Sequence, residues 1–83
     1  MEDYLYTMPK MYVNHAIRLN LSGHLIESYN IYRKAISLYR QRFRTDRSII
    51  RRIRHVGSLN RAIARYKLLS GKIRCRQLKT IIE

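Results

Sequence analysis

The stretch from Arg47 to Arg65 constrains this chain most, because it reads as one strongly amphipathic helix. At about 100° per residue, one side of the predicted helix gathers five apolar residues: Ile49, Ile53, Val56, Leu59 and Ile63. The opposite side gathers five arginines: Arg47, Arg51, Arg54, Arg61 and Arg65. No acid lies among these arginines. Such a helix needs a hydrophobic core on one side and favours a polyanionic partner on the other.

Positive charge is concentrated in the later part of the chain. The 83 residues include 18 Lys and Arg against 5 Asp and Glu, which gives a formal net charge of +13. Residues 33–83 carry sixteen of these cations and two of the acids. Charge on this scale favours nucleic acid, an anionic membrane surface or an acidic protein as partner. Arginine outnumbers lysine by 13 to 5, and its planar guanidinium suits phosphate contacts.

The length of the chain and its 46% of hydrophobic residues predict one small globular domain rather than a disordered segment. Cys75 is the single cysteine, which excludes an internal disulfide and a zinc site built on cysteines. No apolar run approaches the roughly 20 residues of a membrane-spanning helix. The acidic start, with Glu2 and Asp3, differs from a secretory signal or a transit peptide, so we expect an intracellular, cytoplasmic protein.

The first part of the chain predicts an arm followed by a short helix. Residues 1–9 are apolar enough that we expect this irregular arm to pack on a partner or back on the fold. Pro9 suits the first turn of a helix, which we expect over about 10–22. Gly23 is a suitable terminator, because the residue after a helix often has a positive φ. The helix is expected to bury Val13, Ala16, Ile17 and Leu21.

A second helix is predicted over about 25–44. Its apolar residues recur at spacings of three and four: Leu25, Tyr29, Tyr32, Ile36, Tyr39 and Phe43. Ser28 and Ala35 lie beside this stripe, where small side chains let a neighbouring helix approach closely. We expect the stripe to form one half of the core.

The third helix is predicted over about 47–69, after a turn at Thr45 and Asp46 in which Asp46 is the N-cap. Ser70 and Gly71 are expected to end it. We expect its apolar side to pack on four residues of the second helix: Tyr29, Tyr32, Ile36 and Phe43. Residues 72–83 form a short basic tail with enough apolar residues for a last helical segment.

These elements define an all-α fold without strands, linkers or repeats. The expected architecture is a small three-helix bundle, or a four-helix bundle if the last segment is a helix of its own. We expect a single domain over residues 1–83, in which the arm (1–9) and the basic tail (72–83) flank the helical bundle (10–71).

Catalysis finds little support in the sequence. The five acids are scattered singly, so no carboxylate pair is available for acid–base chemistry. His15, His24 and His55 are far apart and lack nearby ligands, so we interpret them as helix-end or surface residues. The three glycines cannot form a phosphate-binding loop. We therefore expect no enzyme, cofactor or metal, and no small-molecule substrate.

The strongest functional signal is the basic second part, which we interpret as one continuous cationic surface for nucleic acid. The candidate contacts are Arg40, Arg42, Arg44, Arg47, Arg51, Arg52, Arg54, Arg61, Arg65, Lys72, Arg74, Arg76 and Lys79. Structured RNA is favoured over DNA, because shape and backbone recognition need only such cations and no recognition-helix arrangement is evident. Tyr29, Tyr32 and Tyr39 fall at core spacing. Tyr4, Tyr6 and Tyr66 are candidates for contacts outside the fold.

Residues 16–36 resemble the first hairpin of MIT (microtubule-interacting and transport) and TPR-type domains. The resemblance is carried by Ala16, Gly23, Glu27, Ser28, Tyr32, Ala35 and Ile36, and the stretch LNRA at 59–62 is similar to part of the third MIT helix. That family's role implies a groove between the second and third helices for a partner's helical tail. The groove would lie near Val56, Leu59 and Ile63.

A second resemblance is to the LYR-motif proteins, which are small basic helical adaptors of mitochondrial complexes. It is carried by SLYR at 37–40, with Arg44 following and RRIR at 51–54. This resemblance implies a mitochondrial location and a protein partner.

Two functions are therefore expected to compete. The leading one is a non-enzymatic RNA-binding protein, a small structural component of a ribonucleoprotein such as the ribosome, with neighbouring proteins around it. The alternative is a helical protein–protein interaction module of MIT or LYR type that docks on acidic partners.

Overall fold

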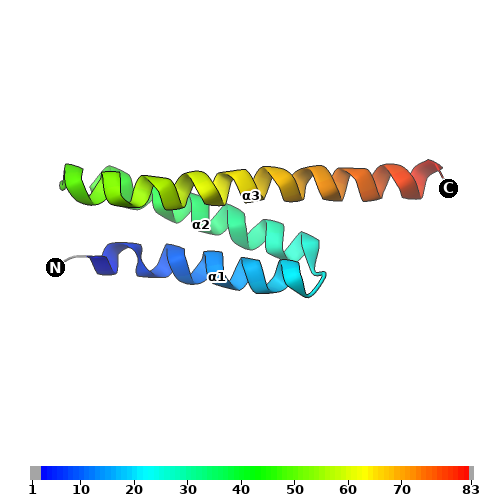
Figure 1. The fold of residues 1–83 in the computed structure, drawn as a ribbon, viewed down its shortest axis with the longest axis horizontal. Coiled ribbons are helices and arrows are strands. Elements are labelled where there is room, and N and C mark those ends of the chain that lie inside the picture. The colour runs from blue at the N-terminus through cyan, green and yellow to red at the C-terminus, as the bar shows by residue number, and fades with distance from the viewer. Residues whose placement is uncertain (1–2, 83) are drawn as a thin grey trace.

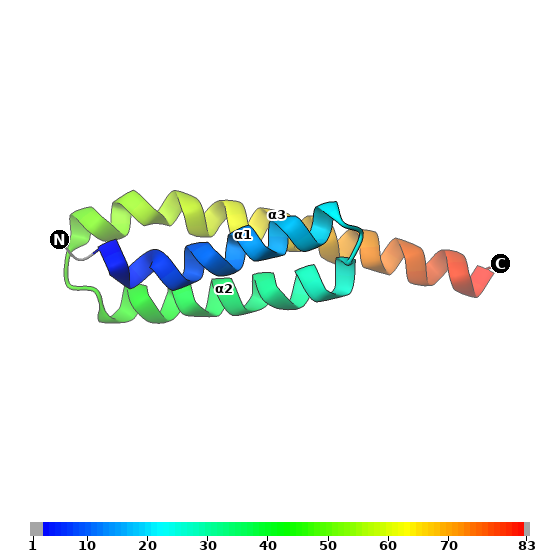
Figure 2. The same cartoon turned by 90° about the horizontal axis from the view of Figure 1, so that it is seen from below.

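Three helices account for nearly all of the chain. The computed structural model describes the backbone of residues 3–82 and the side chains of residues 4–78. A 3₁₀ turn (Asp3–Tyr6) precedes the helices α1 (Thr7–Leu21), α2 (Leu25–Thr45) and α3 (Ile49–Ile82). In Figure 1 and Figure 2, α1 and α2 form a hairpin, and α3 runs back along α2 and past the end of the hairpin. The predicted all-α bundle is confirmed for the described residues, with three helices and no strand.

The length of α3 sets the length of the molecule. Its 34 residues span about 51 Å, close to the 53 Å long axis of the fold. The expected end at Ser70 and Gly71 is wrong, and residues 72–82 continue α3 instead of forming a separate tail. The helix continues past Ser70 and Gly71 because residues on both sides of them pack on the hairpin. Leu69 is buried, and Ile73 is half-buried beside the α1–α2 turn. A glycine inside a helix costs only about 1 kcal/mol, which this continuity offsets.

Helix α1 starts earlier than the sequence suggests. Its first residue is Thr7, so Pro9 lies in the first turn, where it is buried and its missing N–H costs little. Ala16 is fully buried, as expected. Leu21, the last residue of α1, is 82% exposed, so the prediction that it is buried is wrong. Gly23 follows the helix with φ of +84°, which confirms its role as terminator.

Small side chains bring α1 and α2 close together. Ser28 is fully buried, and its Oγ donates a 2.6 Å hydrogen bond to the backbone carbonyl of Ala16. Ala35 is also fully buried on the same side of α2. The close approach expected from these residues is therefore confirmed, and it makes the hairpin the tightly packed half of the fold.

The core face of α3 differs from the predicted apolar stripe. Among the described side chains of α3, the buried ones are His55, Ala62 and Leu69, which lie about a third of a turn around the helix from that stripe. Ile49 and Ile53 are 64% and 65% exposed. Hydropathy alone could not locate this buried side of α3, because the side combines the small Ala62 with the polar His55, whose ring stacks on Tyr6.

On α2, the predicted stripe is largely correct. Tyr32, Ile36 and Tyr39 are buried, and the remaining members are half-buried. Burial raises the pKa of the Tyr39 phenol, while a hydrogen bond with the Ser58 side chain opposes that rise. A polar residue of α3 thus meets the inward hydroxyl of an α2 tyrosine.

The N-terminal arm folds back on the bundle. Tyr6 is fully buried, with its ring 4.1 Å from that of His55 and 5.4 Å from that of Phe43, measured between centroids. Tyr6 is therefore a core residue, and its interpretation as an outward contact is wrong. His55 is equally misassigned as a helix-end or surface residue, since the Tyr6 ring covers it.

The α2–α3 turn is built by Asp46 and Ser48. The backbone N–H of Ser48 donates to Asp46 Oδ1 at 3.0 Å, and the Arg51 N–H donates to Ser48 Oγ at 3.2 Å. The side chain of Ser48 therefore caps α3, and the prediction that Asp46 is the N-cap is wrong. Asp46 is instead buried and holds the turn.

Candidate nucleic-acid interface

Packing of α3 divides its cations between two flanks. The buried line through His55, Ala62 and Leu69 faces the hairpin, so residues on either side of this line meet different neighbours. Arg65 and Lys67 are two positions apart, which separates them by about 160° around the helix. Arg65 lies toward α1 and Lys67 lies toward α2. Two cationic surfaces therefore replace the single continuous one that we expected.

The first surface is a line of cations along α3, which we call the arginine row. Its members recur at spacings of seven, four and seven residues, which keeps them on one side of the helix. They are Arg54, Arg61, Arg65 and Lys72, and all are exposed. The row extends over about 27 Å of helix. A rigid helix thus presents four positive charges in line.

A cleft between α1 and α3 runs beside the arginine row. Lys10 of α1 lines it together with Arg61 and Arg65. Burial raises the pKa of Tyr32, and a hydrogen bond with the Arg65 side chain opposes that rise. Arg65 is therefore tethered to the core, whereas Lys10 adds a fifth cation to this flank.

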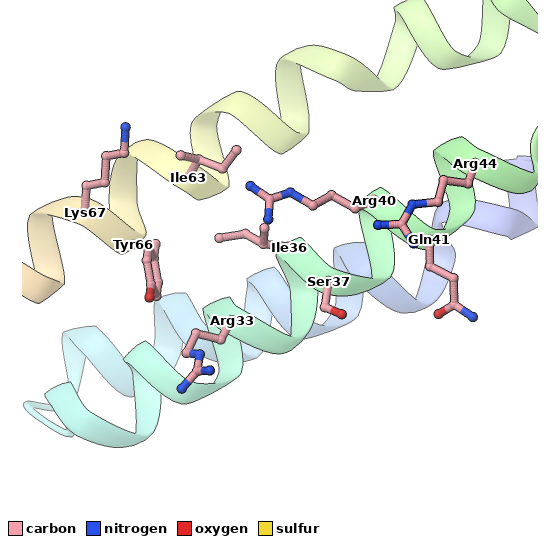
Figure 3. Close-up of a pocket in the computed structure, with 9 residues that line it drawn as sticks. All are labelled: Arg33, Ile36, Ser37, Arg40, Gln41, Arg44, Ile63, Tyr66 and Lys67. Carbon is pink, nitrogen blue, oxygen red and sulfur yellow. The ribbon is translucent and has the colours of Figure 1, made fainter.

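The second surface is a cationic groove of about 620 Å³ between α2 and α3, shown in Figure 3. Arg33, Arg40 and Arg44 of α2 line one wall, and Lys67 of α3 lines the other. Its residues also include Ile36, Ser37, Gln41, Ile63 and Tyr66. Among the described residues, no carboxylate lines this groove or the α1/α3 cleft.

Tyr66 belongs to the α3 wall of the cationic groove. Its ring stacks on that of Tyr29, with centroids 4.6 Å apart and hydroxyl oxygens 2.8 Å apart. This hydrogen bond raises the pKa of Tyr66, burial adds to the rise, and Arg33 opposes it. Because Tyr29 covers one face of the ring, Tyr66 is mainly a packing residue and offers at most its other face to a nucleobase. The prediction that Tyr66 makes contacts outside the fold is thus limited to the side of the ring that lines the cationic groove.

Three of the predicted contacts, Arg42, Arg51 and Arg52, are half-buried rather than exposed. Arg51 pairs with Asp46 through hydrogen bonds of 2.6 Å from Nη2 and 2.9 Å from Nε. An acid therefore does neutralise part of the predicted arginine side. Arg42 and Arg52 are half-buried, and within the described residues the buried Nε of each has no hydrogen-bond partner.

The remaining predicted contacts line neither the cationic groove nor the α1/α3 cleft. Arg47 is exposed in the turn before α3, and Arg74 and Arg76 are exposed toward the far end of that helix. Arg76 lines a shallow hollow beside the α1–α2 turn. The side chain of Lys79 lies outside the described residues.

The groove implied by the MIT resemblance is not one surface. Leu59 packs against the core, Ile63 lines the cationic groove, and Val56 lines a separate hollow at the start of α3. The structure therefore brings Ile63 together with arginines rather than with the other two residues.

Three cations that are not among the predicted contacts also line these surfaces. Arg33 and Lys67 line the cationic groove, and Lys10 lines the α1/α3 cleft. A signal for Arg33 was present. Arg33, Arg40 and Arg44 repeat at spacings of seven and four, which is the spacing of the arginine row. Lys10 and Lys67 carry no such signal, because each joins its surface through the packing of helices.

The described residues hold no group of three His, Cys, Asp or Glu side chains that could bind a metal ion. Over the same residues, no helix has an apolar stretch long enough to cross a membrane. The chemistry visible on this part of the chain is cation presentation by guanidinium and ammonium groups.

Comparison with known proteins adds no family to these observations. The chain matches no family model, no curated protein and no solved structure. Function is therefore inferred from the geometry and charge of the two surfaces.

Proposed function

We propose that this chain is a non-enzymatic RNA-binding protein that serves as a small structural component of a ribonucleoprotein particle such as the ribosome. The observation that carries the proposal is the pair of cationic surfaces on either flank of α3; within the part of the chain that the structure describes, no carboxylate lines the cationic groove or the α1/α3 cleft. A protein that needed charge only for solubility would gain from mixed signs, whereas residues 33–83 of this one carry sixteen cations and two acids.

Phosphate contacts explain the arrangement of the arginine row. Duplex nucleic acid presents a dense, regular array of phosphates, and each cation that approaches one releases condensed counterions. Arg61 and Lys72 are exposed on one side of a continuous helix, so their spacing is fixed before binding. A rigid row avoids most of the ordering cost that flexible basic tails incur.

Structured RNA is the better target, since its helices are recognised mainly through shape, phosphates and 2′-hydroxyls. The exposed residues of α3 supply many cations but no set of Asn or Gln side chains that would read base edges. Two surfaces on one helix also suit a folded RNA, which can approach a protein from more than one side.

The test is binding of a fluorescein-labelled RNA stem-loop, followed by anisotropy over a range of salt concentrations. The variant Arg61→Gln/Lys72→Gln removes two charges from the arginine row. We expect it to weaken binding roughly tenfold at low salt and to reduce the slope of log K against log salt by about 2.

The matched control is Arg18→Gln/Lys34→Gln, which removes two exposed charges of the hairpin that line neither the α1/α3 cleft nor the cationic groove. It should change affinity much less. Equal losses for the two variants would indicate diffuse attraction by net charge and would contradict the proposed interface. Arg51 is unsuitable for this test, because its loss would disturb Asp46 and the fold.

A further inference from the structure

An apolar hollow of about 460 Å³ lies where the end of α2 meets the start of α3. Phe43 of α2 and Ile49, Ile53 and Val56 of α3 line it, together with Arg52. Ile49 and Ile53 leave about two thirds of their surface in solvent, and Val56 is 44% exposed. These are the residues that the sequence pattern assigns to the core, so the packing of α3 leaves part of its apolar side without cover.

The shape of the hollow suits a helix. Ile49, Ile53 and Val56 are spaced by four and three residues, so they line up along two turns of α3. Phe43 adds an apolar surface from α2, so the site is a shallow, open hollow shared by two helices. Grooves of this kind take the apolar side of an amphipathic helix at positions i, i+3 or i+4, and i+7.

The charge around the hollow defines the partner. Arg52 lines the hollow, and its buried Nε lacks a hydrogen-bond partner among the described residues. Arg44 and Arg47 are exposed and lie close in the chain to Phe43 and Ile49. A second copy of this protein would bring the same arginines face to face, with a net charge of +13 on each chain. Complementarity therefore requires carboxylates beside the partner's apolar residues.

We propose that this hollow docks an acidic amphipathic helix of another protein. Leucine-like side chains of that helix would enter between Phe43 and Ile53, and flanking Glu or Asp residues would pair with Arg44, Arg47 and Arg52. The site shares Arg44 with the cationic groove but is separate from the arginine row, so RNA bound along that row leaves the hollow open to this partner. The proposal does not depend on the proposed RNA binding.

The experiment uses two labelled synthetic helical peptides of about 18 residues with the same Leu positions on one side. One carries Glu and the other Lys at the positions that flank the leucines. We expect the full-length protein to bind the Glu peptide and to bind the Lys peptide at least tenfold more weakly, measured by fluorescence anisotropy.

Matched variants place the peptide. Ile53→Asp should weaken binding of the Glu peptide at least tenfold, whereas Leu68→Asp should change it less than about twofold, because Leu68 is equally exposed but lies outside the hollow. Circular dichroism checks that both variants remain folded. Leu68 lies between Arg65 and Lys72 on the side of α3 that carries the arginine row, whereas Ile53 lies in the hollow. Leu68→Asp should therefore weaken RNA binding more than Ile53→Asp, which separates failure of this site from failure of the RNA interface.

Several outcomes would overturn the proposal. One is equal binding of the Glu and Lys peptides, and another is equal sensitivity to the two variants. A third is self-association of the protein, measured by sedimentation, that is lost in Ile53→Asp and is not inhibited by the Glu peptide. The hollow would then bind a second copy of the chain. A fourth is that the protein does not bind the Glu peptide but binds phosphatidylserine vesicles, and that Ile53→Asp abolishes the vesicle binding.

Discussion

The hydroxyl of Tyr6 donates a 2.7 Å hydrogen bond to Asp46 Oδ2, which ties the N-terminal 3₁₀ turn to the turn between α2 and α3. Burial raises the pKa of Tyr6 well above its ordinary value, and the Asp46 carboxylate adds to this effect. The same carboxylate accepts from Arg51 and from the backbone of Ser48. Asp46 therefore fixes both the arm and the first turn of α3, and with them the rotation of α3 on the hairpin.

Replacing Asp46 with Asn should destabilise the fold at neutral pH. The amide would leave the Arg51 guanidinium without its charge partner in a half-buried site and would disturb the bond to Tyr6. We expect the midpoint of thermal unfolding, followed by circular dichroism, to fall by at least about 5 °C. Glu27→Gln makes the same change of charge at an exposed position and should leave the midpoint nearly unchanged. Similar midpoints for the two variants would contradict the role of Asp46.

The contribution of Asp46 should depend on pH in one direction. Hydrogen bonds from Arg51, then from Tyr6 and the Ser48 backbone, lower the pKa of Asp46 below its ordinary value, so the folded state favours the carboxylate. Its stabilisation is then complete above the unfolded pKa of about 3.9 and is lost as the pH falls from there toward the folded pKa. The gap in unfolding midpoint between wild type and Asp46→Asn should shrink between about pH 4 and pH 2. A gap independent of pH would show that the effect is not electrostatic.

The sequence predicted the helices well, because capping, periodicity and Gly23 are local signals. It did not predict the rotation of α3, which depends on contacts between distant segments. Tyr6 and His55 meet across 48 intervening positions, and no hydropathy pattern marks a histidine as a core residue. The apolar stripe at Ile49 and Ile53 was real as a pattern, but the polar cluster at Asp46 turned another side of the helix inward.

The candidate site was predicted in its chemistry but not in its geometry. Charge distribution pointed to Arg40, Arg44 and Arg61, and these are exposed on cationic surfaces. Which cations share a surface depends on helix packing, so the division into two flanks was invisible in the sequence. The ion pair between Arg51 and Asp46, five residues earlier, is not evident from the sequence, because Asp46 at that position fits a helix cap equally well.

Glycine substitutions should report directly on the continuity of α3. Gly57 and Gly71 lie inside the helix, and a Cβ added at either position would meet only open space, so alanine fits at both sites. Gly57→Ala and Gly71→Ala should each stabilise the protein by about 0.5–1 kcal/mol in urea unfolding. Gly23→Ala should instead destabilise it by about 1 kcal/mol or more, because φ at this residue is +84°. Destabilisation by Gly71→Ala would mean that α3 ends there.

Ser28 tests the close packing of the hairpin. Loss of its hydrogen bond to the Ala16 carbonyl in Ser28→Ala should cost about 1 kcal/mol, since Ala still allows the helices to approach. Ser28→Leu should cost more, because the added atoms have no room at a fully buried position between two helices. Urea unfolding measures both. A leucine variant as stable as the alanine variant would show that α1 and α2 can separate without loss.

The two cationic surfaces should contribute separately to RNA affinity. Arg40→Gln/Arg44→Gln removes charge from the groove between α2 and α3, and Arg61→Gln/Lys72→Gln removes it from the arginine row. If a folded RNA contacts both, the free-energy losses should add in the quadruple variant, since the two sets lie on different flanks and share no partners. Each pair should also reduce the salt slope by about 2. If one pair of substitutions leaves RNA affinity unchanged, both by itself and when added to the other pair, the RNA contacts only one flank and the other surface serves a different partner.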